Sequence, residues 1–133
     1  MTWFLVGLIW TIQTVHYPSF GSIDPDLYSD FQQRHMSKLG PLVGPAWFVE
    51  GVLVLAIFLT APTSTTLLWA VIGGLLELIV IGVTIRSSMP AHASLTSGFD
   101  ATVHHRLVRT NWIRTLAWSG RGLIAFVLLW SAF

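Results

Sequence analysis

Four apolar runs divide the chain into alternating hydrophobic and polar stretches. The runs cover approximately residues 3–20, 43–61, 67–86 and 101–131. Each reaches the ~17–25 residues that a helix needs to cross a hydrocarbon core about 30 Å thick. The pattern therefore predicts an all-α fold, an integral membrane four-helix bundle, with residues 1–133 forming a single membrane domain.

The connection between the first two runs, residues 21–42, carries the signals of a short extra helix. Asp24 is a favourable N-cap, and Pro25 after it suits the first helical position. The Gly40–Pro41 pair predicts the end of that helix. Four side chains at intervals of four predict one inward face: Leu27, Phe31, His35 and Leu39.

The connection between the third and fourth runs predicts a second short extra helix. Ser88 and Pro90 suit its start, it would carry His92, and Gly98 would end it. Asp100 is the expected N-cap of the last helix. Short extra helices are thus expected in the 1–2 and 3–4 connections, at the same end of the bundle.

Composition and charge distribution support a membrane protein and suggest its orientation. Hydrophobic residues make up 53% of the chain and charged residues 10%, against roughly 25% charged residues in an average soluble domain. All seven basic residues lie in or beside the connections 21–42 and 86–115. The positive-inside rule then predicts cytoplasmic charged loops and termini outside. The chain has no cysteine, which excludes disulfides and thiolate ligands, and no nucleic-acid-binding surface is expected.

The last helix carries a polar stripe that an ordinary membrane span would not have. At helical spacing, five side chains fall on one face: His104, Asn111, Arg114, Trp118 and Arg121. A cation at the bilayer centre costs about 3 kcal/mol on insertion scales, so both arginines should face the bundle interior. Two interpretations stay open for them: they neutralise Glu50 or Glu77, or they bind an anion or carbonyl group of a substrate.

Histidines and a carboxylate are expected to gather at the charged end of the bundle. This group is the candidate metal site: His16, His35, Glu50, His92 and His104. Imidazole and carboxylate ligands suit iron, copper or zinc, bundle interiors commonly hold such sites, and haem is a further candidate. Alternatively, each histidine is an interfacial or hydrogen-bonded residue. His105 points about 100° away from His104 on a helix and is expected at the surface.

Polar and aromatic side chains beside this group would line a cavity for a lipophilic molecule. The candidate substrate-binding residues are Gln13, Tyr17, Asn111, Trp112, Arg114, Trp118 and Arg121. Ordinary packing between helices is the alternative explanation for the tryptophans.

Three segments resemble a group of small bacterial four-span membrane proteins: "TVHYPSF", "GPAWFVE" and "PAHASLTSGFDATVHHRLVRTNWIRTLAW". The resemblance covers nearly the whole chain and implies a bacterial cytoplasmic membrane location. Glu77 lies outside the shared pattern, which favours a local structural role for it. More distantly, the architecture is similar to the anthrone-oxygenase-like membrane proteins, which have four spans and a histidine near the end of the first. That similarity implies phenolic polycyclic substrates and molecular oxygen.

These observations lead to one principal functional hypothesis and two alternatives. The principal one is a membrane-embedded redox enzyme, of oxygenase or oxidoreductase type, with a His/Glu cavity near one membrane face. It would act on a lipophilic small molecule that enters from the lipid bilayer. The first alternative is an accessory subunit of a larger membrane redox or photosynthetic complex that binds pigment, quinone or lipid. The second is a transporter, which with so few spans would need a homo-oligomer.

Overall fold

The computed structural model describes residues 1–130, and this part of the chain is entirely helical apart from short turns. The predicted all-α class is therefore confirmed for these residues, and residue 131 of the last predicted span lies outside them. The elements are α1 (Thr2–Thr11), the π-helical η1 (Ile12–His16), α2 (Tyr17–Ser19), the 3-10 helix η2 (Phe20–Ser22), α3 (Pro25–Thr60), α4 (Ser64–Val83), the π-helical η3 (Thr84–Ser88), α5 (Met89–Leu95) and α6 (Ala101–Trp130).

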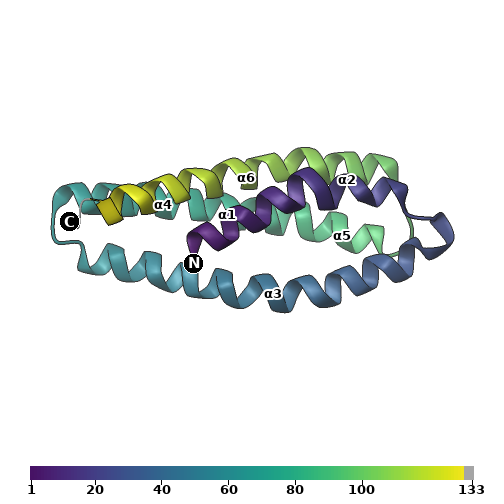
Figure 1. Ribbon diagram of the computed structural model, residues 1–133, viewed down its shortest axis with the longest axis horizontal. Coiled ribbons are helices and arrows are strands. Elements are labelled where there is room, and N and C mark those ends of the chain that lie inside the picture. The colour runs from purple at the N-terminus through teal and green to yellow at the C-terminus, as the bar shows by residue number, and fades with distance from the viewer. Residues whose placement is uncertain (131–133) are drawn as a thin grey trace.

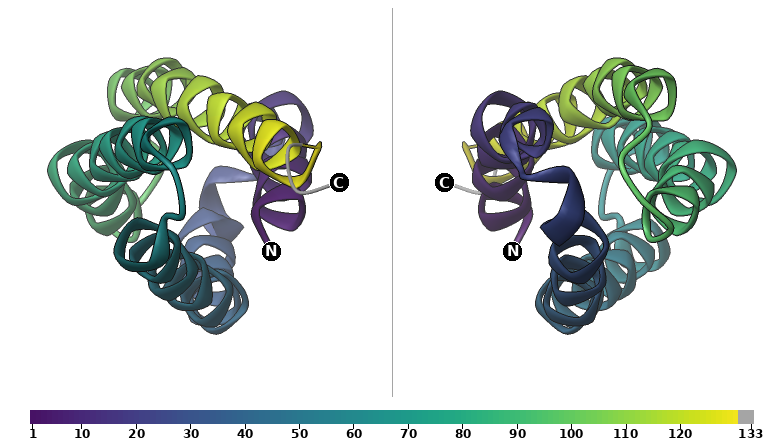
Figure 2. Two further views of the ribbon diagram at one scale, coloured as in Figure 1. Left: turned by 90° about the vertical axis from the view of Figure 1, so that its left-hand side faces the viewer. Right: turned by 90° about the vertical axis from the view of Figure 1, so that its right-hand side faces the viewer.

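The helices lie roughly parallel to one long axis (Figure 1) and surround it when viewed end-on (Figure 2). α6 packs against α1 on one side and α4 on the other, while α3 contacts the same two helices from the opposite side. The turns after η2 and α5 lie at one end of the molecule, and the α3–α4 turn lies at the other (Figure 1). We call the end with the turns after η2 and α5 the charged end, because most of the basic residues lie in the segments that lead to these turns.

Three helices are long and apolar enough to cross a membrane: Pro25–Thr60, Ser64–Leu95 and Ala101–Trp130. The 36 residues of α3 span roughly 54 Å at 1.5 Å per residue, well beyond a hydrocarbon core of about 30 Å. Large apolar side chains such as Phe48 and Leu59, 73% and 71% exposed, cover its outer face. These helices are consistent with a membrane protein.

The first helical stretch, from α1 to η2, lies beside only part of the length of α3. Thr2 lines the same cavity as Glu50 and Arg121, and Glu50 is ten residues from the end of α3 at Thr60. α1 therefore begins about midway along the apolar part of α3 (Figure 1). The expected fourth crossing over residues 3–20 stays a prediction.

The predicted helix end at Gly40–Pro41 is wrong, because α3 continues through both Pro41 and Pro45. A proline inside a helix removes one backbone hydrogen bond, which breaks many helices in water. In and near lipid, a helix is still the best way to satisfy the remaining backbone groups, so membrane helices tolerate proline. The expected extra helix of the 1–2 connection is thus the first part of α3. Similarly, α5 follows α4 through η3 without a loop.

The predicted helix starts at Asp24 and Asp100 are confirmed, and the predicted inward face of the first extra helix is wrong at Leu27. The Asp24 carboxylate accepts a hydrogen bond from the Asp26 N–H at 2.9 Å, and the Asp100 carboxylate accepts one from the Val103 N–H at 2.9 Å. Leu27, however, is 60% exposed. His35 is buried, and Phe31 and Leu39 are half-buried against the core. Tyr28 and Gln32 take the place of Leu27 on the buried face.

Two clusters of buried side chains form the core. One lies between α1 and the middle of the long helices and includes Leu5, Ile9, Val80 and Trp118. The other lies at the charged end and is rich in aromatic groups, with Tyr17, Phe20 and Tyr28 among its members. Close helix contact in the first region depends on glycine, because a Cβ on Gly122 would lie 3.2 Å from the Val6 side chain.

Candidate functional site

The polar stripe predicted for the last helix faces the interior, as expected. Its five members are all buried, with exposed fractions between 0% for Asn111 and 7% for Arg114 and His104. α6 therefore presents a continuous polar face to its neighbours along most of its length. Three groups of contacts divide this face: a histidine centre at the charged end, a central arginine, and a deeper ion-pair network.

His92 lies at the middle of the histidine centre and is held by two hydrogen bonds. The Gln32 side-chain amide donates to His92 Nδ1 at 2.9 Å and to the His92 carbonyl at 3.3 Å. Since Nδ1 accepts, the ring proton of neutral His92 is on Nε2, which lies 2.9 Å from the Tyr17 hydroxyl oxygen. The Tyr17 hydroxyl oxygen accepts the hydrogen bond from His92 Nε2–H, so the hydroxyl proton of Tyr17 can be donated to another group.

Two further histidines approach this centre from different elements. His16 Nε2 and His35 Nδ1 lie 2.9 Å apart, and the His35 and His92 rings are 5.1 Å apart between centroids. His35 Nε2 is buried and makes no hydrogen bond with any residue of the described chain. His104 instead donates through Nε2 to the Tyr17 carbonyl oxygen at 2.8 Å, which fixes α6 to the first helical stretch.

The candidate metal ligands do not form one cluster. Within residues 1–130, no group of three or more histidine, aspartate or glutamate side chains is arranged to hold a metal ion. The ring nitrogens of His92 are both engaged, and His16 and His35 face each other. Glu50 lies fifteen residues beyond His35 on α3, roughly 22 Å along the axis. The structure thus brings His16, His35 and His92 together and places Glu50 elsewhere.

Glu50 belongs to an ion-pair network around Arg121, deep in the apolar region. Arg121 Nη2 lies 2.9 Å from Glu50 and its Nε lies 3.2 Å from Glu77, while Nη1 donates to the Gly73 carbonyl at 2.7 Å. The indole N–H groups of Trp118 and Trp47 donate to Glu50 and Glu77, respectively. The interpretation that Arg121 neutralises Glu50 and Glu77 is confirmed.

Arg114 has a different environment from Arg121, although both are buried. No carboxylate of the described residues forms an ion pair with it. Its Nη1 donates to Ser88 and Asn111, each at 3.2 Å, and its guanidinium carbon lies 5.4 Å from the centre of the Trp118 ring. It also interacts with the Tyr17 side chain. The charge of Arg114 is therefore solvated only by neutral groups.

A cavity of about 230 Å³ lies directly beside Arg114. Its polar wall is formed by Tyr17, Ser88, His92 and Arg114, and its apolar walls include Ile9, Val43, Trp47 and Trp118. Both π-helical segments flank it, since η1 leads into Tyr17 and η3 ends at Ser88. Such segments interrupt the regular helical register and occur frequently at functional sites.

The remaining candidate residues support this cavity or lie outside it. The Asn111 side-chain amide donates to Gln13 Oε1 at 2.9 Å, so these two side-chain amides orient the face that carries Arg114. Trp112 is 40% exposed and packs edge-to-face on Trp10 at 5.6 Å, away from the cavity. His105 is exposed, as expected. Sequence reasoning missed Gln32, although its spacing of three residues before His35 places both on one helix face.

Comparisons of the chain with family models, curated proteins and solved structures gave no match.

Proposed function

We propose that this protein binds a lipophilic ring compound with a phenolic or carbonyl oxygen, in the cavity bounded by Tyr17, Ser88, His92 and Arg114. The observation that carries the proposal is the contrast between the two buried arginines. Arg121 is paired with two carboxylates, whereas Arg114 has only neutral partners within the described chain. A ligand oxygen with partial or full negative charge would complete the solvation of Arg114.

The shape and lining of the cavity favour an amphiphilic ligand. The apolar walls come from α1, α3 and α6 and lie toward the membrane region, while the polar groups gather on one wall. Ligand pockets commonly combine a mostly apolar lining with a few convergent polar groups. A ligand would place its rings against Trp47 and Trp118 and its oxygen between Tyr17 and Arg114.

The same geometry supports proton transfer at that oxygen. The hydrogen-bonded chain runs from Gln32 through His92 to Tyr17. Tyr17 can donate its hydroxyl proton to the ligand oxygen and become a tyrosinate, which the His92 Nε2–H and the Arg114 cation stabilise until the proton returns. An imidazole linked to a phenol is a common arrangement for general acid–base catalysis. We assign to this chain the binding and acid–base part of an enzyme that acts on phenols or quinone-like carbonyls. This role agrees with the substrate class that the distant resemblance to anthrone-oxygenase-like proteins implies.

A metal or haem centre held by the histidines is a separate proposal, and the purified protein can test it directly. Iron, copper or zinc bound by His16, His35, His92 or His104 would require these rings to leave their present hydrogen bonds. Elemental analysis and an absorption spectrum of the protein, purified without a metal-chelating tag, would detect such a centre. A stoichiometric metal or a Soret band would replace our acid–base interpretation with a metal-based one.

The membrane arrangement proposed with this function follows the distribution of charge. The charged end would face the cytoplasm of a bacterial cell, with residues 3–20 as a further membrane-embedded segment and the termini directed to the other side. The cavity would then lie in the cytoplasmic half of the membrane. Ligands could reach it from the lipid phase.

The binding test compares 1-naphthol with naphthalene, which has the same rings without the oxygen. Quenching of tryptophan fluorescence reports binding, because Trp47 and Trp118 line the cavity. We expect 1-naphthol to bind more tightly, and Arg114→Gln to weaken it by roughly 10- to 100-fold, the range for a charged hydrogen bond. Arg109→Gln, an exposed arginine on the same helix, is the matched control. Equal binding of the two compounds, or an unaltered Arg114→Gln variant, would refute the proposal.

A further inference from the structure

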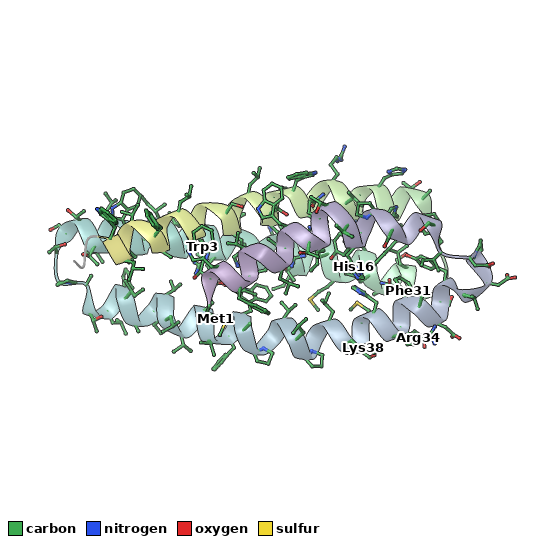
Figure 3. The ribbon with its side chains drawn as sticks, in the orientation of Figure 1. Met1, Trp3, His16, Phe31, Arg34 and Lys38 are labelled. Carbon is green, nitrogen blue, oxygen red and sulfur yellow. The ribbon has the colours of Figure 1, made fainter. Side chains whose placement is uncertain are left out.

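A further hollow lies at the charged end, between α3 and the end of η1, and is distinct from the cavity beside Arg114. It has a volume of about 360 Å³ and is formed by residues of α3 and the end of η1. Its basic members are His16, Arg34, His35 and Lys38, and its apolar members include Phe31 and Leu42. Figure 3 shows His16 and Phe31 between the first helical stretch and α3, with Arg34 and Lys38 along α3. We call this hollow the basic groove.

Three polar groups of the basic groove have no partner in the described chain, whereas His16 Nε2 and His35 Nδ1 are bonded to each other. Within the part of the chain that the structure describes, neither Arg34 nor Lys38 forms an ion pair, and the groove has no acidic lining residue. His35 is only 8% exposed, and its Nε2 has no hydrogen-bond partner among the described residues. Two cations and a buried, unsatisfied imidazole nitrogen together suit an anion with several acceptor oxygens.

The depth of the groove identifies the kind of anion. Lys38 and Arg34 precede Leu42 on α3 by four and eight residues, or roughly 6 and 12 Å along the helix. The apolar run of this helix starts just after Leu42. The two headgroup layers together add about 10–15 Å to the hydrocarbon thickness, so each is roughly 5–8 Å deep. The backbone of Lys38 then lies at headgroup level, and that of Arg34 lies a few Å farther out, where its long side chain can reach back to the phosphates. The groove is therefore basic where lipid phosphates lie and apolar where acyl chains begin.

We propose that the basic groove binds the phosphate headgroup of an anionic phospholipid. Arg34 and Lys38 contact the phosphate oxygens. When His16 donates through Nε2 to His35 Nδ1 across their 2.9 Å contact, the proton of neutral His35 is on Nε2, which donates to the same phosphate. An acyl chain lies over Leu42 and along the exposed apolar face of α3. The proposal does not depend on the function assigned to the Arg114 cavity, although Leu39 lines both hollows.

Native mass spectrometry of the full chain, released from micelles that contain defined lipids, tests this proposal. Phosphatidylglycerol and phosphatidylcholine with identical acyl chains are offered in equal amounts. We expect one phosphatidylglycerol molecule to be retained preferentially. The double variant Arg34→Gln/Lys38→Gln should lower that retention by roughly 10- to 30-fold, the effect of two interfacial cations. High salt should weaken the preference.

The matched control is Arg106→Gln/Arg109→Gln, which removes two exposed arginines at the same end of the molecule but on α6. A local site predicts that this control keeps the lipid preference, while a general surface charge effect predicts an equal loss in both double variants. Equal loss, or unchanged retention in the groove variant, would overturn the proposal. Inorganic phosphate is offered in a parallel sample. If it is retained as tightly as the lipid, the groove is a soluble-phosphate site and the lipid assignment is wrong.

Discussion

Replacing Arg121 with methionine removes the cation that lies between Glu50 and Glu77. The variant loses contacts of 2.9 and 3.2 Å to the two carboxylates and a 2.7 Å hydrogen bond to the Gly73 carbonyl. Both carboxylates remain buried, at 1% and 6% exposure. Removing one partner of a buried ion pair typically costs about 3–5 kcal/mol, because an uncompensated charge stays inside. We expect a loss of unfolding free energy in this range.

A second variant separates this charge effect from a loss of packing. The triple substitution Arg121→Met, Glu50→Leu and Glu77→Leu removes the whole network and leaves apolar side chains of similar size. Such replacements are often neutral or stabilising by about 1–4 kcal/mol, so the triple variant should recover most of the stability that Arg121→Met loses. Unfolding by titration with a denaturing detergent, followed by circular dichroism, measures both effects.

The control for these measurements is Arg109→Met, an exposed arginine on the same helix, which should change the stability by less than about 0.5 kcal/mol. Our reasoning fails if Arg121→Met is as stable as the wild type. It also fails if the triple variant is less stable than Arg121→Met alone. Either result would mean that the network does not neutralise a buried charge.

Four further predictions follow from single contacts. The Tyr28 hydroxyl is buried without a hydrogen-bond partner in the described chain, so Tyr28→Phe should keep or raise the thermal stability by up to about 1 kcal/mol. In the same thermal melts, Gly40→Ala should stabilise α3 by about 0.5–1 kcal/mol, because within the described residues no atom lies within 4 Å of the added Cβ. Gly122→Ala should instead destabilise the fold, because its Cβ would crowd Val6 at 3.2 Å; stabilisation would contradict the close α1–α6 packing. Gln32→Leu removes both hydrogen bonds to His92, and we expect weaker 1-naphthol binding with the overall helicity unchanged.

The sequence predicted the helical class and the buried face of the last helix because both depend on local periodicity. The positions of His104, Asn111, Arg114, Trp118 and Arg121 follow from 3.6 residues per turn, and all five are buried. The helix starts at Asp24 and Asp100 also depend on neighbouring residues alone. Features of this kind need no knowledge of the rest of the fold.

The length of α3 and the composition of the histidine centre could not be obtained in this way. Gly40 and Pro41 normally indicate a break, but α3 continues through both, as membrane helices can where a helix is the best way to satisfy the remaining backbone groups. Once α3 is continuous, Glu50 is carried roughly 22 Å away from His35, so the expected five-residue centre separates into two. The position of α1 along α3 is similarly unpredictable from local patterns, because it depends on packing that places Thr2 near Glu50.

The two arginines of α6 show why position decides the role of an otherwise identical side chain. Arg121 reaches two carboxylates from α3 and α4, so its charge is neutralised within the protein. Arg114, seven residues earlier on the same face, meets a serine, an asparagine, a tyrosine and an indole ring. Neutral groups solvate a buried cation less well than a carboxylate does. Arg114 lies at the wall of a cavity, so a ligand oxygen with negative charge would supply the solvation that the neutral groups do not.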